Sequence, residues 1–414
     1  MGNDVTRIAL LNAHNTKNYG SMMMCENVIT HLSRLLHEPH FVVLSDQLQE
    51  TQSRLEAATQ LHCIEVRPRF PPLFRSSKIT SNFRARINAS ILRYSSLSKA
   101  VDDCEIVIIL GGDDISEYYS KLRVVDILLR LITLKVARRR VFLLGQTIGP
   151  ITSWRKPLAR IVFDRMDAIY HRGPESFEYC RGVLGCKGKQ SVAADLAFLP
   201  LAREAEQNII AKLGIQPGGY LTLVPSGLRT HYSEQSEMNY LNGLVHIAEH
   251  LLRIAVSKNL KLVLLPHVAF DRILVRAIQQ RLSAECVVAV SDLLMPYQAR
   301  AILGGSTLCV SQRMHAAISS LEQGIPVIAI AYSVKYSDVI GSYLDLPKLV
   351  VEADRSGFLS TANEVCRRID EVWVELEEWR TKIKISVGRA RYDAARQLEE
   401  LATLYLADKA ARKS

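Results

Sequence analysis

The stretch Ile106-Val107-Ile108-Ile109-Leu110-Gly111-Gly112-Asp113-Asp114 joins five consecutive apolar residues to a turn of two glycines and two aspartates. An unbroken apolar run of this length is typical of a parallel β-strand that is covered on both faces. A glycine-rich turn after such a strand commonly leads into the next helix. The sequence therefore predicts an α/β sheet, and ligands bind to such sheets just beyond the carboxyl ends of the strands.

Similar apolar runs recur along the chain and alternate with segments of helical periodicity. The expected helices include residues 22–36, 240–256 and 271–282. Alternation of strands and helices at this spacing predicts a doubly wound parallel sheet. The expected strands are 8–11, 41–44, 63–66, 106–110, 141–144, 168–170, 191–193, 220–224, 262–265, 287–290, 308–310 and 327–330.

The pattern restarts near residue 203, after a polar connection at 199–207. A chain of 414 residues is long enough for two or more domains. We expect an N-terminal Rossmann-like domain at 1–202 and a second at 203–356. The segment 357–414 reads as helical and is too long for one more crossover helix. Our hypothesis is that it returns to brace the N-terminal domain.

Composition narrows the class of protein. Hydrophobic residues make up 48% and charged residues 23%, which excludes a disordered or fibrous chain. The net charge of +10 favours anionic partners. The eight cysteines include no C-x-x-C pair, so we expect reduced, buried thiols and no metal site. No membrane span and no signal peptide are visible, and we therefore expect a cytoplasmic protein.

One segment breaks the alternation. Between Arg67 and Lys99 the chain carries eight basic residues and no acidic residue. Within this segment, apolar side chains recur every four residues at Ile79, Phe83, Ile87 and Ile91. Such an amphipathic helix could dock on its own domain, which is the simpler interpretation, or lie on an anionic membrane surface. We include peripheral membrane contact through 67–99 as a prediction.

The residues best suited to anion binding and proton transfer follow the strand at 308–310. Arg313 offers a fixed fork of donors for a carboxylate or phosphate, and His315 can transfer a proton near neutral pH. Two residues apart at a helix start, both side chains could reach one cleft. Alternatively, Arg313 caps a carbonyl group and His315 is buried in a domain interface. The chain has no G-x-G-x-x-G and no Walker A sequence, which argues against a dinucleotide or P-loop site.

Several short motifs, in order along about 320 residues, resemble those of the polysaccharide pyruvyltransferases. They are Asn18-Tyr19-Gly20, Gly111-Gly112, Gly145-Gln146-Thr147-Ile148-Gly149-Pro150, Arg172 with Glu175 and Ser176, Asp195-Leu196-Ala197-Phe198, Arg313 and His315 with Gly324 and Pro326, and Tyr332 with Lys335. Each motif is short, but their shared order is specific. Two positions depart from the family pattern: Ser21 stands where an Asp is common, and Asp113 replaces a third glycine.

The resemblance implies a GT-B-like fold and transfer of an enolpyruvyl-derived group from phosphoenolpyruvate to two hydroxyls of a sugar. The products would be a pyruvate ketal and phosphate. The sugar would belong to a cell-surface polysaccharide or its lipid-linked precursor. We expect phosphoenolpyruvate as a co-substrate, no further cofactor and no metal. The N-terminal domain would bind the acceptor, and the departures at Ser21 and Asp113 therefore bear on acceptor identity.

Roles follow for particular residues. We assign His315 as the general acid/base and Arg313 to binding of the donor anion. Lys335 and Arg172 are further candidates for anion binding. The remaining substrate-binding residues that the resemblance implies are Asn18, Gly20, Gly111, Gly112 and Gln146.

Two other functions remain open at this point. A GT-B glycosyltransferase that uses a nucleotide-sugar would share the fold and the basic cleft. A non-catalytic basic module that binds nucleic acid or anionic lipid would explain the charge but not the loops after the strands. We expect no nucleic acid partner.

Overall fold

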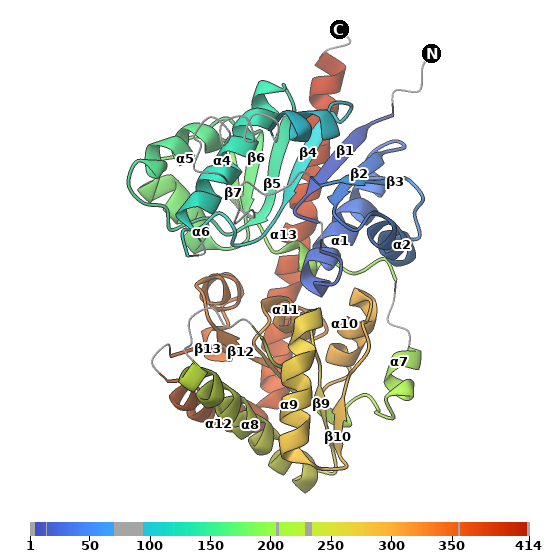
Figure 1. Cartoon of the computed structure of the whole chain (residues 1–414), viewed down its shortest axis with the longest axis vertical. Coiled ribbons are helices and arrows are strands. Elements are labelled where there is room, and N and C mark those ends of the chain that lie inside the picture. Colours follow the sequence, from blue (N-terminus) through green and yellow to red (C-terminus); the bar gives the residue numbers. More distant parts are fainter. Residues whose placement is uncertain are drawn as a thin grey trace. The chain divides into compact units, whose positions relative to one another are not determined.

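A computed structural model describes residues 5–13, 15–69, 94–118, 120–203, 207–227, 234–354 and 357–411. The chain forms two compact units, each built around one parallel β-sheet (Figure 1). The first unit comprises Met1–Thr16, Met24–Leu196 and Asp393–Ser414, and the second comprises Lys17–Met23 and Ala197–Tyr392. The short segment Lys17–Met23 thus belongs with the second half of the chain.

The sheet of the first unit has seven parallel strands in the order β3-β2-β1-β4-β5-β6-β7. Its central strand β4 is buried over its whole length, as the apolar run 106–110 requires. The strands are β1 (Arg7–Leu11), β2 (His40–Ser45), β3 (Ile64–Pro68), β4 (Ile106–Leu110), β5 (Arg140–Gln146), β6 (Ala168–His171) and β7 (Gln190–Val192).

The sheet of the second unit has six parallel strands in the order β10-β9-β8-β11-β12-β13. In this sheet β8 and β11 are neighbours, so the loops that follow them lie next to each other at the carboxyl ends of the strands. The strands are β8 (Tyr220–Val224), β9 (Lys261–Leu264), β10 (Val287–Ala289), β11 (Cys309–Ser311), β12 (Val327–Ala331) and β13 (Val350–Glu352).

Helices connect the strands and cover the sheets. On one face of the first sheet, Val107 and Ile109 of β4 share a core cluster with Val124 and Leu128 of α4. The helices are α1 (Tyr19–Leu35), α2 (Leu48–Thr59), α4 (Lys121–Val136), α5 (Arg155–Phe163), α6 (Pro174–Glu178), α7 (Gln207–Lys212), α8 (Glu234–Ser257), α9 (Arg272–Leu282), α10 (Pro296–Gly304), α11 (Met314–Glu322), α12 (Phe358–Val374) and α13 (Leu376–Ala411). The predicted fold of two doubly wound parallel sheets with a long C-terminal helix is confirmed.

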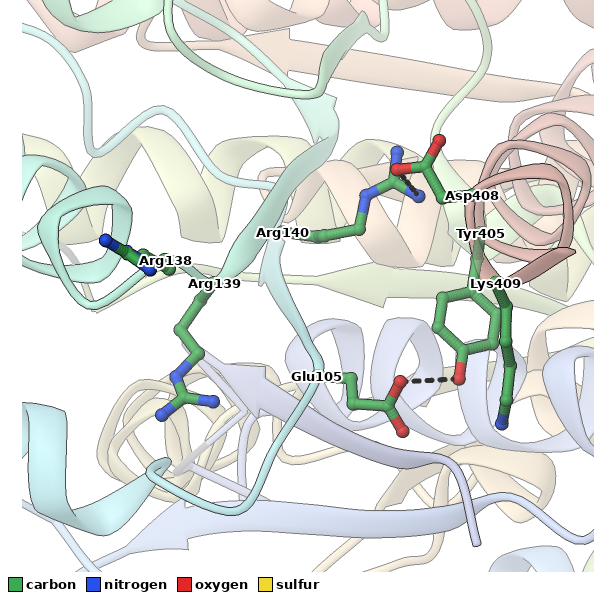
Figure 2. Close-up of a pocket in the computed structure, with 7 residues that line it drawn as sticks. All are labelled: Glu105, Arg138, Arg139, Arg140, Tyr405, Asp408 and Lys409. Atoms are coloured by element: carbon green, nitrogen blue, oxygen red, sulfur yellow. Dashed lines mark hydrogen bonds and ion pairs between the residues drawn. The ribbon is translucent and has the colours of Figure 1, made fainter. Parts of the chain in front are cut away.

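The last part of α13 packs against the first sheet, within the first unit. Gln397 donates from Nε2 to the carbonyl O of Ala194 at 2.9 Å. Farther along, the Tyr405 hydroxyl donates to Glu105 at 2.8 Å, and Arg140 donates to the carbonyl O of Leu404 at 2.8 Å. Figure 2 shows the small pocket that Tyr405, Glu105 and Arg140 border, at the amino ends of β4 and β5.

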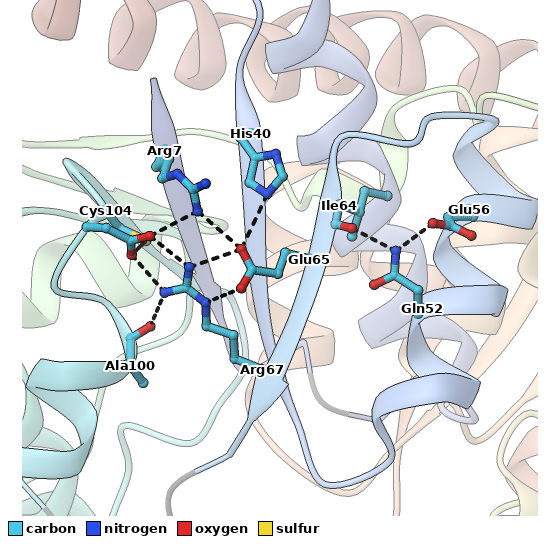
Figure 3. Close-up of polar contacts among 10 residues, drawn as sticks. Arg7, His40, Gln52, Glu56, Ile64, Glu65, Arg67, Ala100 and Cys104 are labelled. Atoms are coloured by element: carbon cyan, nitrogen blue, oxygen red, sulfur yellow. Dashed lines mark hydrogen bonds and ion pairs between the residues drawn. The ribbon is translucent and has the colours of Figure 1, made fainter. Parts of the chain in front are cut away.

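In the described part of the segment 67–99, Arg67 and Arg69 are held in ion pairs. Arg67 bridges Glu65 and Asp103 at 2.6 and 2.7 Å, and Arg7 joins the same two carboxylates (Figure 3). The hydrogen bonds from Arg67 lower the pKa of Glu65 and of Asp103. The side chain of Arg69 lies 3.7 Å from Asp46. These arginines therefore connect strands β1 and β3 with the neighbouring loops at one side of the first sheet.

The rest of that segment, residues 70–93, lies outside the described residues, and with it the apolar stripe and most of the bases. Membrane contact through this segment stays a prediction. In the part of the chain that the structure describes, no helix has the length and apolar character needed to span a bilayer.

Candidate functional site

Arg313 and His315 flank the start of α11, directly after β11. The turn between strand and helix is closed by Ser311, whose hydroxyl accepts from the backbone N–H of Arg313 at 3.1 Å and donates to its carbonyl O at 2.8 Å. Arg313 has extended backbone angles, and the helix begins at Met314. The two side chains thus occupy the carboxyl edge of the second sheet, where parallel sheets bind ligands.

Arg313 makes a two-point ion pair with Asp271. Its Nε donates to Oδ2 at 3.0 Å and its Nη2 donates to Oδ1 at 2.6 Å. Asp271 is fully buried. Burial alone would lower the pKa of Arg313, but the bonds to Asp271 outweigh burial and raise it. The guanidinium therefore stays charged and is fixed in orientation.

Asp271 also fixes the loops around this pair. Its carboxylate accepts from the backbone N–H of Gly227 at 2.8 Å and from that of Val268 at 3.1 Å. Gly227 follows β8 and Val268 follows β9, so one carboxylate connects three strand-ending loops. A side chain at Gly227 would meet the ring of Phe270 at 2.8 Å, and the Arg313 guanidinium lies 5.0 Å from the centre of that ring.

His315 packs against the segment Lys17–Met23, which belongs to the same unit. A Cβ atom added to Gly20 would overlap Nδ1 and Cγ of the His315 ring and lie 2.7 Å from its Cβ. Only glycine allows this approach. The segment is also attached by a bridge between Asn18 and Val268, and Asn18 accepts from the N–H of Gly20 at 3.2 Å.

A second histidine also contacts this segment. His267 follows β9, is 2% exposed, and meets the ring of Tyr19 edge-on with 5.2 Å between the ring centres. The hydroxyl of Tyr19 accepts from the N–H of Leu294 at 2.8 Å. Burial, together with His315, Arg313 and Arg300, lowers the pKa of His267 well below 6.5. The neighbouring residues Tyr19 and Gly20 therefore contact one histidine each.

Lys335 adds a further positive charge to the second unit. Its Nζ donates to the Tyr332 hydroxyl at 3.0 Å and lies 4.7 and 5.6 Å from the ring centres of Tyr332 and Tyr336. The Tyr336 hydroxyl donates to the carbonyl O of Gln312, the residue before Arg313, at 2.6 Å. Lys335 is thus connected to the Arg313 loop through an aromatic pair.

The other predicted substrate-binding residues lie in the first unit, at the carboxyl edge of its sheet. A side chain at Gly111 would overlap the carbonyl O of Gly145, so the ends of β4 and β5 approach closely. The carbonyl O of Gly112 accepts from the N–H of Thr147 at 3.0 Å. Gln146 is buried and donates from Nε2 to the carbonyl O of Ile109 at 3.0 Å.

Arg172 is held in a buried ion pair of the same unit. Its Nη1 donates to Asp195 at 2.9 Å and its Nε donates to the Thr147 hydroxyl at 2.7 Å. Its Nη2 has no hydrogen-bond partner among the described residues. Beside it, His171 contacts the Ser176 hydroxyl through Nδ1 at 2.9 Å, and burial lowers its pKa to about 4. The structure therefore connects the predicted motifs around Thr147, Arg172, Ser176 and Asp195.

The pocket of Figure 2 is a poorer candidate for a substrate site. It is small, about 110 Å³, and lies at the amino ends of the strands. Three of its charged groups already have partners, since Arg140 pairs with Asp408 at 3.0 Å and Glu105 accepts from Tyr405. In the described parts of the chain, no cluster of three or more His, Cys, Asp or Glu side chains could hold a metal ion.

Sequence reasoning proposed Arg313, His315, Lys335 and the Asn18–Gly20 motif as site residues, and all of them belong to the second unit of the structure. It overlooked Asp271 as the partner of Arg313, and it gave no role to His267. The signal available for both was the sequence Pro266-His267-Val268-Ala269-Phe270-Asp271 directly after a predicted strand. The sequence had placed Ser21 on the acceptor side, whereas Lys17–Met23 groups with the unit that contains His315.

Comparison with solved structures defines the class of fold. A UDP-glucosyltransferase from Polygonum tinctorium superposes with a TM-score of 0.58 at 12% identity over 97% of this chain and 98% of that one. S. aureus MnaA, in a co-structure with UDP, gives 0.61 at 9% identity over 97% of each chain. A putative UDP-N-acetylglucosamine 2-epimerase from Listeria monocytogenes gives 0.60 at 9% identity over 95% and 94%. The fold is GT-B-like.

The family follows from the sequence itself. The model of the polysaccharide pyruvyl transferase family matches residues 18–334, which include every motif described above apart from Lys335. The chain therefore belongs to this family, and membership implies a transferase with a polysaccharide acceptor. None of the curated proteins matches the chain.

Proposed function

We propose that the protein transfers the enolpyruvyl-derived group of phosphoenolpyruvate to two hydroxyls of a sugar and thereby forms a pyruvate ketal. The observation that carries this proposal is the arrangement at the start of α11. There, a fixed arginine and a titratable histidine are two residues apart at the carboxyl edge of the second sheet. A small donor with a carboxylate and a phosphate suits such a site.

The chemistry requires a proton and a place for negative charge. His315 donates a proton to the methylene carbon of phosphoenolpyruvate, and the neighbouring carbon becomes electrophilic. A sugar hydroxyl attacks this carbon and loses its proton, and the bond to the bridging phosphate oxygen then breaks. A second hydroxyl closes the ketal as its proton leaves. The balance is one phosphoenolpyruvate and one diol giving one ketal and one phosphate.

Arg313 has a restricted role in binding the donor, because Asp271 occupies two of its three nitrogens. We assign Nη1 to the donor anion. Lys335 supplies a second cation on the neighbouring segment, beside Tyr332. These groups are fixed before the donor arrives, so little reorganisation opposes stabilisation of the departing phosphate.

We assign the acceptor to the first unit. Gly111, Gly112 and Gln146 shape the loops after β4 and β5, and a backbone without side chains allows a sugar to approach closely. Arg172 contributes mainly by holding these loops through Thr147 and Asp195, and its Nη2 is available for a substrate oxygen. The acceptor would be a sugar of a cell-surface polysaccharide or of its lipid-linked precursor.

The competing function is transfer from a nucleotide-sugar, because the structural neighbours include a UDP-glucosyltransferase. Incubation with an acceptor and either phosphoenolpyruvate or UDP-sugars distinguishes the two. Release of inorganic phosphate from phosphoenolpyruvate supports the proposal. Release of UDP together with stable phosphoenolpyruvate contradicts it and favours glycosyl transfer.

A further inference from the structure

We propose that His267 is a second histidine of the donor site and that its Nε2 hydrogen-bonds an anionic oxygen of the donor. This inference rests on the proposed function, because the ligand is phosphoenolpyruvate. It assigns a contact that the motifs of the chain do not include. His315 transfers the proton, and His267 binds without transferring one.

The first argument is an unpaired buried atom. His267 is 2% exposed, and its Nε2 has no hydrogen-bond partner among the described residues. Buried polar atoms in native proteins are nearly always paired, so each exception calls for an explanation. A ligand oxygen that arrives only with the substrate provides one.

The second argument is position. His267 lies in the loop that follows β9, four residues before Asp271, the partner of Arg313. Its ring contacts Tyr19, while Gly20 contacts His315. Both histidines therefore contact one short segment, and Arg313 lies in the same unit, near enough to His267 to act on its charge.

The third argument is charge. Burial lowers the pKa of His267 well below 6.5, and His315, Arg313 and Arg300 act on it in the same direction. The carboxylate of Asp271 is directed to Arg313 and to two backbone N–H groups. His267 is therefore neutral at pH 7. A neutral imidazole can donate one hydrogen bond to an anion while it adds no repulsion toward the guanidinium of Arg313.

The alternative is that His267 only packs against Tyr19. Three substitutions separate the two roles. His267→Phe keeps an aromatic ring against Tyr19 but removes Nε2. His267→Gln carries a terminal amide near the position of Nε2, whereas His267→Asn reaches only as far as Nδ1. His250→Gln is the matched control, since His250 lies on α8 of the same unit and pairs with Asp370 at 2.8 Å.

The measurement is the dissociation constant for phosphoenolpyruvate by calorimetry, with phosphate release as a second readout. We expect His267→Phe and His267→Asn to weaken binding at least tenfold, His267→Gln to recover most of it, and His250→Gln to behave as wild type. Wild-type affinity in His267→Phe, or equal affinity in the Gln and Asn variants, would overturn the inference. If His267→Phe does not fold, the comparison of Gln with Asn decides. Failure of the wild type itself to bind would instead refute the proposed function.

Discussion

Asp271 occupies one whole edge of the Arg313 guanidinium, with donor–acceptor distances of 3.0 and 2.6 Å. The two-point partner of this arginine is therefore a buried carboxylate of its own unit. A ligand would meet the remaining nitrogen, Nη1. Because Asp271 also holds the backbone at Gly227 and Val268, the pair determines the shape of the site as well as its charge.

Arg313→Lys should be poorly tolerated although it keeps the charge. A lysine cannot span both oxygens of Asp271, and one nitrogen cannot also serve the donor. Because breaking a buried pair costs about 3–5 kcal/mol, we expect lower stability toward urea and a KM for phosphoenolpyruvate raised at least tenfold. Arg367→Lys, in the exposed pair of Arg367 with Glu364, is the control and should change neither quantity. An unchanged KM and rate in Arg313→Lys would assign Arg313 a structural role alone.

His315→Ala should abolish turnover and leave donor binding largely intact. Loss of a general acid typically lowers the rate by about 10²–10⁴. The substitution also opens space beside Gly20 without adding a clash. Steady-state phosphate release and calorimetric binding of phosphoenolpyruvate, measured on the same preparation, test both parts. Near wild-type turnover would remove His315 from the mechanism.

Gly20→Ala should displace the His315 ring, because the new methyl group would overlap Nδ1 and Cγ. We expect turnover to fall at least tenfold while the fold is kept. Gly388→Ala is the matched control, since a methyl group there meets nothing within 4 Å and Gly388 lies inside α13. Alanine favours a helix over glycine by about 1 kcal/mol, so the control should be active and slightly more stable. Full activity of Gly20→Ala would show that the site tolerates a displaced ring.

The first unit should lose stability in mild acid through His171. The pKa of His171 is lowered from 6.5 to about 4 in the folded protein by burial. Between these values the unfolded chain binds more protons than the folded chain, which favours unfolding. The contribution of neutral His171 to the free energy of unfolding is therefore complete above pH 6.5 and is lost as the pH falls toward 4. It amounts to about 3 kcal/mol. Urea unfolding at pH 7 and pH 4.5 should show a smaller pH dependence in His171→Asn than in wild type.

The exposed His37→Asn provides the comparison for that experiment, because it lies in the same unit. It should retain the wild-type dependence on pH. An equal dependence in wild type and in His171→Asn would show that other groups govern acid stability.

Most strands could be predicted because they are nearly continuous apolar runs. Strand β4, the predicted 106–110, is Ile106–Leu110 in the structure, and β8 likewise matches 220–224. The strand that the sequence missed, β13, has three residues, of which only Val350 and Val351 are apolar. A run that short gives no periodicity to detect.

The candidate site could be predicted only where residues of suitable chemistry are also close together in the sequence. Arg313 and His315 follow a strand and stand two residues apart, so the sequence places them together. The pairing of Arg313 with Asp271, 42 residues away, depends on how the loops after β9 and β11 meet. Likewise, Gly20 reaches His315 only because Lys17–Met23 folds with the second unit. Tertiary structure supplies these relations, and no local pattern encodes them.

The most direct test of the central claim is the thermal unfolding of the wild-type protein with phosphoenolpyruvate and, separately, with UDP. A ligand at about 100 times its Kd stabilises the state that binds it by roughly 2.7 kcal/mol. The account predicts that phosphoenolpyruvate raises the unfolding temperature of wild type, has a smaller effect at the same concentration on Arg313→Lys, and that UDP has no effect on either. Protection by UDP and none by phosphoenolpyruvate would contradict it.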